Sequence, residues 1–272
     1  MPALVLGSRF KGTIHTGAMP LLHKYLGTPV LNLLINFFHR PRKAGITDCN
    51  SGFRCFYKKE FDAWGIASDG MDFASEMLLK AFKSGATVEE VPISLSRNDK
   101  DRIPHLKTWQ DGMKHLLRFF VETPDFFSFA GISLFLLGIS ILIPSYIVDI
   151  VELGPLRILG PHTTMIANLV TGIGIQLWCF GGFIALKDYK VKLPVKLTYR
   201  WIIEIREDKL FWFVSLYFLF VFTVLGYIFI IWESHLFKFL NLEDNLLIII
   251  FSITGLSSLV VNVLAIHILK RV

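Results

Sequence analysis

Hydrophobic and polar residues follow two different patterns along this chain of 272 residues, and the pattern changes near residue 125. From there on, long apolar segments alternate with short polar connections. Four such segments lie at 126–148, 163–186, 210–232 and 246–269. Each is long enough to cross a hydrocarbon layer of about 30 Å as a helix. The sequence therefore predicts an all-α domain of four transmembrane helices over residues 125–272.

The segment 106–124, directly before the first apolar segment, has the spacing of an amphipathic helix. Large apolar residues recur at steps of three and four: Leu106, Trp109, Met113, Leu116, Leu117 and Phe120. Polar residues fall on the other face: Lys107, Gln110, Asp111, Lys114 and Arg118. A basic amphipathic helix that leads into a span is typical of the membrane surface. The alternative is an ordinary surface helix packed on a core.

Residues 1–105 carry charges throughout and resemble part of a globular α/β domain. Strands are predicted at Ala3–Gly7 and from Val88 to Leu95, and helices at Lys58–Trp64 and Asp72–Phe82. Strand, helix and strand with short connections indicate an α/β layer. The first strand reads as a middle strand with no partner before it, so we expect a further segment to precede Met1.

The apolar segment that begins at Met19 is interrupted by Gly27 and Pro29, and its uninterrupted part is too short to span a membrane. A basic cluster follows it directly, with His39, Arg40, Arg42 and Lys43. An apolar helix beside basic residues suits the headgroup layer, so we predict an interfacial segment over residues 19–43. A core helix followed by a solvated turn is the alternative.

Lysine and arginine predict the orientation of the chain, because short cytoplasmic loops are enriched in them. The second loop is rich in cations: Lys187, Lys190, Lys192, Lys196, Arg200, Arg206 and Lys209. The first and third loops hold only Arg157 and Lys238. We therefore expect an integral, multi-pass membrane protein whose N-terminal domain, second loop and C-terminus are cytoplasmic. The net charge of +6 is then partly lipid-facing, and nucleic acid is not an expected partner.

Two polar groups in the N-terminal region are candidates for binding an anion. Arg9 follows a strand and the pair Gly7-Ser8, where the chain can approach a ligand closely; a surface ion pair is the alternative. One loop gathers further polar residues, namely Asp48, Asn50, Ser51 and Arg54. Such loops often bind ligands, although the same residue types also favour turns.

Acidic residues occur at two other noteworthy places. Glu76 falls near the apolar stripe of a helix, so its carboxylate must be paired or solvated, and Arg54 is a candidate partner. Asp99 and Asp101 have the spacing of a metal–nucleotide site, but a solvated charge run explains them better. Metal ligands are therefore not predicted in this chain.

Six stretches together resemble the C-terminal half of membrane-bound family 2 glycosyltransferases of the dolichol-phosphate mannose synthase and polyprenyl-phosphate glycosyltransferase type. In order, they are LVLGSRF, GAMPLLHKYLGTPVLN, TDCNSGFRCF, GMDFASEMLLKA, EVPISL and PHLKTWQDGMKHLLRFF. The resemblance implies a partial GT-A domain of the α/β class. It also implies sugar transfer from a nucleotide sugar to polyprenyl or dolichyl phosphate, with inversion at the anomeric carbon.

The resemblance also implies roles for individual residues. The catalytic carboxylates would be Asp48, on the acceptor-side loop, and Glu76, in the helix lining the site. The lipid phosphate would meet six residues: Arg9, Lys24, Ser51, Arg54, Arg102 and His105. The last two would belong to a loop that closes over the donor, where many relatives have lysine in place of His105.

The family's nucleotide-binding first half, with its divalent-metal (Mg or Mn) ligands, has no counterpart in this sequence. We therefore expect a truncated enzyme or half of a split one, inactive alone, with homo-oligomerisation left open. Two other readings remain. One is a non-catalytic membrane module that binds lipid phosphate or pairs with a catalytic subunit. The weaker one is a transporter or flippase, which the lack of charged residues deep in the spans disfavours.

Overall fold

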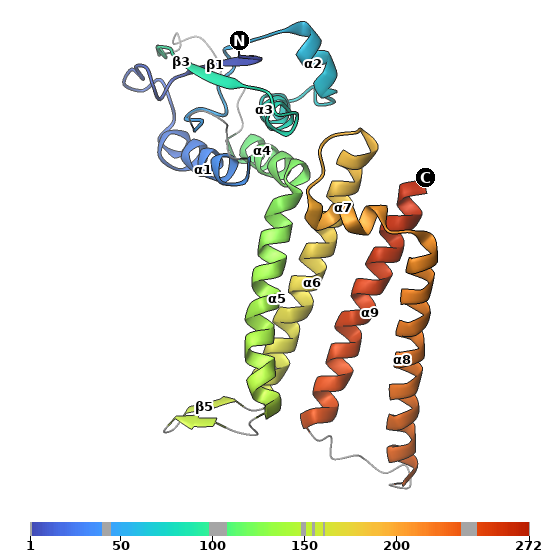
Figure 1. The fold of residues 1–272 in the computed structure, drawn as a ribbon. Coiled ribbons are helices and arrows are strands. Elements are labelled where there is room, and N and C mark those ends of the chain that lie inside the picture. The colour runs from blue at the N-terminus through green and yellow to red at the C-terminus, as the bar shows by residue number, and fades with distance from the viewer. Residues whose placement is uncertain are drawn as a thin grey trace. The chain divides into compact units, whose positions relative to one another are not determined.

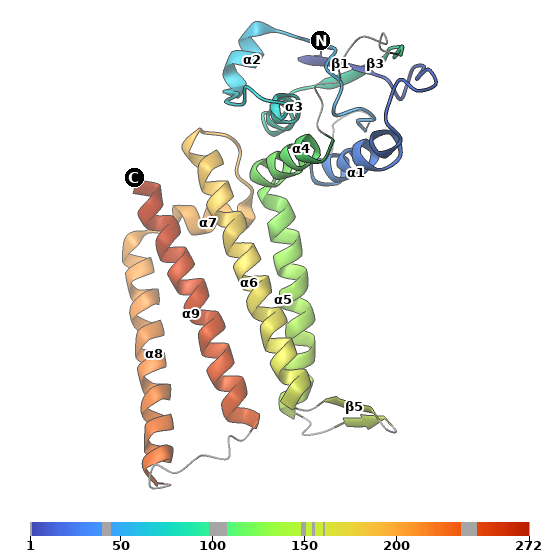
Figure 2. The ribbon, with the colours of Figure 1, turned by 180° about the vertical axis from the view of Figure 1, so that it is seen from behind.

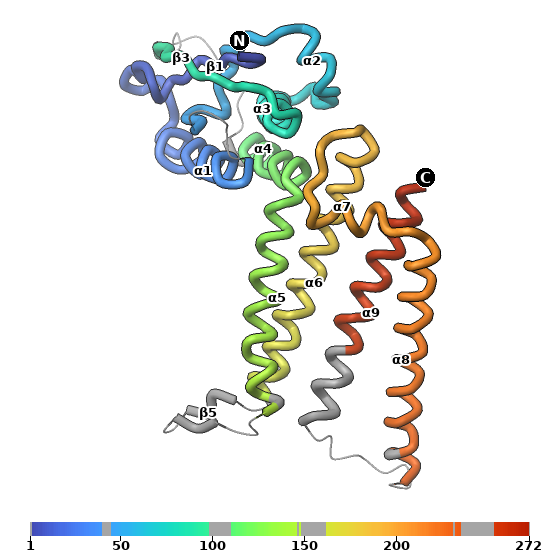
Figure 3. Tube along the Cα trace, in the orientation of Figure 1, coloured from blue at the N-terminus to red at the C-terminus, as the bar shows by residue number. Residues whose placement is uncertain are grey.

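The computed structural model describes residues 2–39, 45–97, 108–147, 151–153, 156–159, 161–234 and 244–271. The chain forms two compact units, one over residues 1–126 with 191–194, the other over 127–190 with 195–272. Figure 3 traces the chain through both, from the blue N-terminus to the red C-terminus. Several residues singled out above lie outside the described residues, namely Arg40, Arg42, Lys43, Asp99, Asp101, Arg102, His105, Leu106, Lys107 and Lys238.

A three-stranded sheet organises the first unit. Strand β1 (Leu4–Ser8) lies between β2 (Arg54–Phe56), which runs antiparallel to it, and β3 (Val88–Pro92), which runs parallel. The strands predicted at Ala3–Gly7 and from Val88 to Leu95 are therefore confirmed, and they lie next to each other in the sheet. The central position of β1 explains its apolar sequence, because Leu4 and Leu6 are fully buried.

Helices of the first unit lie beside the sheet (Figure 1) and share one apolar core with it. They are α1 (Thr28–His39), α2 (Lys58–Trp64), α3 (Phe73–Lys83) and α4 (Thr108–Glu122), with a π-helical turn, η1 (His23–Gly27), before α1. Core residues come from all of these helices except the turn, and include Leu31, Ile35, Trp64, Met77, Leu78 and Phe119. The helices predicted at Lys58–Trp64 and Asp72–Phe82 are thus confirmed.

The chain leaves α3 through Gly85, which follows the last helical residues. Its φ of 77° is left-handed, and its N–H donates to the carbonyl of Phe82, while the N–H of Ala86 donates to that of Ala81. This is a Schellman cap, which satisfies carbonyls that the helix end would leave unpaired. It turns the chain directly into β3.

Helix α4 buries some of its polar side chains and exposes some of its apolar ones, although Gln110 and Lys114 of its polar face remain exposed. Asp111, His115 and Glu122 are at most 9% exposed, whereas Met113 and Leu117 are 47% and 55% exposed. Buried ionic and hydrogen-bonding partners on α3 explain this orientation, because a polar face without partners would not be buried. An ordinary surface helix would do the opposite, so the arrangement favours an interfacial α4.

The exposed side of α1 is also apolar. Leu26, Val30, Leu33 and Phe37 follow one another at helical spacing and are each 46–67% exposed. Figures 1 and 2, which view the molecule from opposite sides, both show α1 beside α4. Together, these residues and the exposed apolar residues of α4 form what we call the apolar surface of the first unit. Exposed patches of this kind usually mark an interaction site.

We expect this apolar surface to contact lipid. Spin labels attached at Leu33→Cys and Leu117→Cys, in a Cys55→Ser background, should be relaxed more by lipid-soluble oxygen than by an aqueous nickel reagent. A label at the exposed Lys59 of α2 serves as the control and should respond in the opposite way. Equal accessibility to the aqueous reagent at all three sites would contradict an interfacial surface.

The second unit contains long apolar helices. These are α5 (Pro124–Ile147), whose first turn belongs to the first unit, α6 (Pro161–Lys190), α8 (Glu207–Ser234) and α9 (Asp244–Arg271). Within the described residues, all four are long and apolar enough to cross a membrane. Two further features were not predicted: a hairpin of β4 (Val151–Leu153) and β5 (Leu156–Leu159), and the short helix α7 (Leu197–Glu204) in the second loop.

Small and polar residues hold the apolar helices together. A Cβ at Gly174 of α6 would come within 2.7 Å of the Gly131 carbonyl oxygen of α5, so only glycine permits this approach. Gln176 donates to Ser258 and accepts from Asn262, which joins α6 to α9. Gly172 of the same helix has open space around it, so it does not serve such a close approach.

Candidate functional site

The end of β1 and the loop before β2 bring Arg9 and Asp48 into direct contact. Arg9 Nε and Nη2 each donate to a different Asp48 carboxylate oxygen at 2.6 Å, and the Arg9 backbone N–H donates to the same carboxylate at 2.9 Å. The Asp48 side chain is fully buried, and that of Arg9 is 20% exposed. This bidentate pair fixes the guanidinium plane and leaves its Nη1 side unpaired among the described residues.

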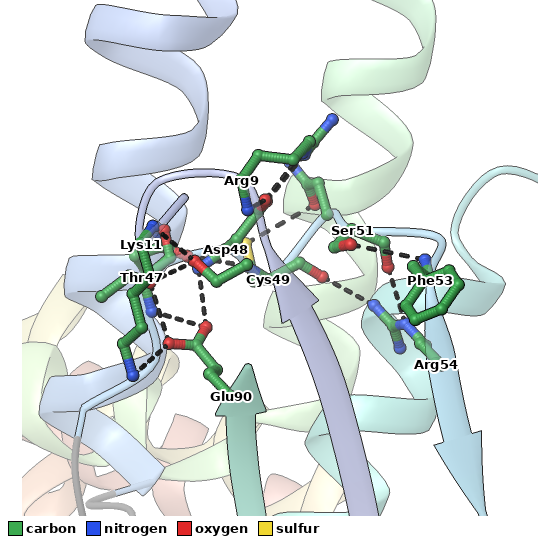
Figure 4. Close-up of polar contacts among 12 residues, drawn as sticks. Arg9, Lys11, Thr47, Asp48, Cys49, Ser51, Phe53, Arg54 and Glu90 are labelled. Atoms are coloured by element: carbon green, nitrogen blue, oxygen red, sulfur yellow. Dashed lines mark hydrogen bonds and ion pairs between the residues drawn. The ribbon is translucent and has the colours of Figure 1, made fainter. Parts of the chain in front are cut away.

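A second carboxylate, Glu90, supports the same loop from β3. It accepts hydrogen bonds from the backbone N–H groups of Thr47 and Asp48 and from the Thr47 hydroxyl, and it pairs with Lys11 at 3.1 Å. Figure 4 shows Glu90, Lys11, Thr47 and the Arg9–Asp48 pair gathered at the ends of β1 and β3. Sequence reasoning missed Glu90, Lys11 and Thr47, because nothing in their spacing indicates that they meet.

Arg54 lies on the other side of the loop and is bound by backbone oxygens. Its guanidinium donates to the carbonyls of Cys49, Ser51 and Ala74 at 2.5–2.8 Å. Burial lowers its pKa to about 10, so the group stays charged at neutral pH. Within the described residues, no carboxylate forms an ion pair with it. An anionic ligand could therefore supply the missing negative charge.

The thiol of Cys49 is buried inside this loop. Burial, helped by the negative charge of Asp48, raises its pKa to about 12. A thiol with so high a pKa is protonated at neutral pH and is a poor nucleophile. Cys49 is therefore a packing residue.

The remaining predicted site residues of this part of the fold are Ser51 and Lys24. The Ser51 hydroxyl accepts from the Phe53 N–H, and its own N–H donates to the Asp48 carbonyl, so it shapes the turn. Lys24 lies in η1, with its ammonium 5.3 Å from the centre of the Tyr25 ring. The structure thus brings Arg9, Asp48, Ser51 and Arg54 together, places Lys24 on a separate element, and leaves the roles of all five as predictions.

Glu76 belongs to a different ionic cluster, between α3 and the turn before it. Its carboxylate, 1% exposed, pairs with Lys80 at 2.6 Å and accepts from the backbone N–H groups of Ala67 and Ser68. Burial alone would raise its pKa, but these hydrogen bonds together with the hydroxyl of Ser68 lower it to about 2. The candidate pairing with Arg54 is wrong, because Lys80, four residues on, is one helical turn away and reaches the carboxylate first.

Helix α4 joins this cluster. Arg118 donates to Asp72 at 2.6 and 2.8 Å, and lies 3.7 Å from Glu76. His115 shares a hydrogen bond with Ser75, and burial lowers the pKa of its imidazole. Lys83, which donates to Glu122, and Asp72 thus fasten α4 to this part of the fold. The catalytic role suggested for Glu76 stays a prediction.

The described residues do not fit a divalent metal. No group of three or more His, Cys, Asp or Glu side chains comes together among them. The carboxylates of Asp48 and Glu90 are already engaged by Arg9, Lys11 and backbone N–H groups. We therefore assign no chemical step in this chain to a metal.

Comparison with known proteins gives one informative match. The chain is 32% identical over 190 residues to the low-salt glycan biosynthesis hexosyltransferase Agl6 of Haloferax volcanii. The match covers 70% of this chain but only 44% of that relative, so the chain spans less than half the length of the curated protein it matches. No family model and no solved structure matches the chain. The chain is therefore similar to a glycan-building hexosyltransferase over part of its length.

Proposed function

We propose that this chain is the acceptor-side part of a membrane glycosyltransferase of the family 2, GT-A type. It would take part in moving a sugar from a nucleotide sugar to polyprenyl or dolichyl phosphate. The similarity to a hexosyltransferase and the four apolar helices support this proposal. The nucleotide sugar and a divalent metal would be bound by a segment outside this chain, since the residues described here offer no metal site.

The observation that carries the proposal is the pair of arginines at the loop 47–54. Arg9 is oriented by a buried carboxylate, and Arg54 is held by carbonyls without an acidic partner among the described residues. Guanidinium groups suit phosphate because their fork of N–H donors matches its oxygens. The exposed apolar surface of the same unit would place this site near lipid headgroups.

The chemistry asked of this chain is simple. The second pKa of a phosphate monoester is near 6, so at neutral pH its oxygen is already an anionic nucleophile and needs little general-base help. That oxygen would form a bond to the anomeric carbon while the bond from this carbon to the nucleotide diphosphate breaks, which inverts the configuration. The arginines would hold the nucleophile in line for attack, and Asp48 would keep Arg9 in place.

Binding of the acceptor lipid is the direct test. Native mass spectrometry of the full chain in detergent should detect dolichyl phosphate but not dolichol, and phosphatidic acid only weakly. Arg54→Lys keeps the charge but loses the fork of donors, so we expect about a tenfold loss of affinity, or roughly 1.4 kcal/mol. Arg200→Lys, a matched change in an exposed i,i+4 pair on α7, should have no effect. Equal binding of dolichol and dolichyl phosphate would contradict the proposal.

We expect the 272-residue chain alone to show no sugar transfer, because it lacks a recognisable donor site among its described residues. A purified chain supplied with nucleotide sugars, dolichyl phosphate and Mg²⁺ or Mn²⁺ tests this. Measurable transfer would show that the chain is complete for catalysis. Binding without transfer would also fit a non-catalytic module that binds lipid phosphate. An upstream coding segment with a donor site would exclude that competing function.

The predicted topology belongs to the same proposal. The cation-rich second loop and the C-terminal Lys270 and Arg271 would lie on the cytoplasmic side with the first unit. A cysteine placed in this loop, as Lys192→Cys, should be protected from an impermeant thiol reagent in intact cells. Labelling from outside the cell would show that this loop lies on the external side and would contradict the predicted topology.

A further inference from the structure

Glu90 is an unusual residue for the middle of a small strand. Its side chain is only 1% exposed, although the next strand residue, Val91, is 42% exposed. A buried carboxylate is costly unless every oxygen is hydrogen-bonded or paired. Apolar residues of similar size usually stabilise such a position as well or better. The carboxylate at this place therefore needs an explanation.

The partners of Glu90 provide one. Its Oε1 accepts both the Thr47 and the Asp48 backbone N–H, at 2.9 and 3.0 Å, and its Oε2 accepts the Thr47 hydroxyl and pairs with Lys11. All of these partners belong to the two segments that carry Arg9 and Asp48. None of them belongs to the apolar core.

The contacts form a continuous chain to the cationic group. Glu90 holds the backbone of Asp48, the Asp48 carboxylate holds the Arg9 guanidinium, and the Thr47 hydroxyl also contacts Ser8 at 2.6 Å. Figure 4 shows Glu90 and Arg9 on opposite sides of the Thr47–Asp48 segment, so Glu90 reaches Arg9 only through it. A shift of this backbone would re-aim the arginine.

We infer that Glu90 is a positioning residue for the anion site, acting on Arg9 through the Thr47–Asp48 backbone. The inference rests on the proposed function for its ligand, but the loop geometry can be tested without one. Glu90 does not contact the lipid phosphate itself. Its negative charge also neutralises Lys11, so the site presents an oriented guanidinium and not a diffuse patch of positive charge.

Two substitutions separate the possible roles of this side chain. Glu90→Gln keeps a carbonyl oxygen in the place of Oε1, so both backbone hydrogen bonds can persist, whereas the NH2 group in the place of Oε2 no longer accepts the Thr47 hydroxyl or pairs with Lys11. Glu90→Ala removes every contact. We expect Glu90→Gln to bind dolichyl phosphate within about threefold of the unchanged protein, and Glu90→Ala to lose about tenfold. Glu89→Ala is the matched control, because successive strand side chains point to opposite faces.

Hydrogen exchange tests the backbone directly. In the full chain in detergent, the amides of Thr47 and Asp48 should exchange at least tenfold faster in Glu90→Ala, but unchanged in Glu90→Gln and Glu89→Ala. Unaltered exchange in Glu90→Ala would overturn the inference, whatever the binding result. Failure of the unchanged protein to bind dolichyl phosphate would instead refute the proposed function.

A double-mutant cycle tests the route through Arg9. In an Arg9→Lys background the guanidinium fork is already lost, so Glu90→Ala should weaken binding by less than about threefold further. Strictly additive losses would mean that Glu90 acts independently of Arg9 and would overturn the inference. A drop in overall stability alone would lower the binding affinity of all variants alike, so it would not produce this non-additivity.

Discussion

Replacing Arg9 with alanine is expected to abolish detectable binding of dolichyl phosphate and to lower the free energy of unfolding of the first unit by about 3–5 kcal/mol. The structural reason is Asp48, whose carboxylate is fully buried and takes three of its hydrogen bonds from Arg9. Without the guanidinium, it becomes an uncompensated buried charge. Opening of the first unit can be followed by thiol labelling of the buried Cys49 in a Cys55→Ser background.

A second variant separates stability from binding. Arg9→Met combined with Asp48→Asn removes both charges, and the new amide can still accept the backbone N–H of residue 9. We expect this double variant to regain more than half of the lost stability, because replacing a buried ion pair by neutral groups is often tolerated. Binding should stay undetectable. Recovery of binding together with stability would show that Arg9 acts only as a structural partner of Asp48.

Acid is expected to destabilise the first unit through Glu76. The folded-state pKa of this carboxyl is about 2, against an ordinary value of 4.5, so it stabilises the fold fully above pH 4.5 and loses this contribution as the pH falls towards 2. The loss should approach about 3 kcal/mol on acidification across this range. Asp72, whose pKa is lowered by Arg118 against the opposing effect of burial, adds a loss of the same sign.

Denaturant unfolding in detergent between pH 5 and 2.5, followed by the fluorescence of the buried Trp64 and the other tryptophans, measures this effect. Glu76→Gln should be less stable at pH 5, because Lys80 is 7% exposed and loses its ionic partner. Its remaining pH dependence should be flatter than that of the unchanged protein. Asp62→Asn, on the exposed side of α2, is the control. An equally steep acid loss in Glu76→Gln would assign the effect to other carboxyls.

Much of the secondary structure can be predicted from the sequence, because local signals suffice for it. The four apolar helices follow from length and hydropathy, and α2 and α3 follow from their periodicity and from Gly85. The hairpin β4–β5 and α7 were missed, because polar loops between spans carry only weak local signals. The π-helical turn η1 was also missed, since nothing in its residues indicates a break in ordinary helical hydrogen bonding.

The orientation of α4 shows where local reasoning fails. The sequence predicts an amphipathic helix there, but not which face is buried. His115 and Glu122 face inward because their partners, Ser75 and Lys83, lie on α3, some forty residues earlier along the chain. A hydropathy pattern contains no information about such distant partners. The apolar segment that follows favours the interfacial interpretation, but it does not say which side chains of the helix are buried.

The sequence by itself determined that this chain has a charged α/β region, an amphipathic helix and four apolar helices. It also identified Arg9, Asp48 and Arg54 as candidate site residues. Only the tertiary structure decided the distant pairings: Arg9 with Asp48, and Glu90 with Lys11 and the Thr47–Asp48 backbone. The physical reason is that hydropathy and turn preferences are local properties of the chain. The ion pairs Arg9–Asp48 and Lys11–Glu90 form only when the sheet brings together residues that are far apart along the chain.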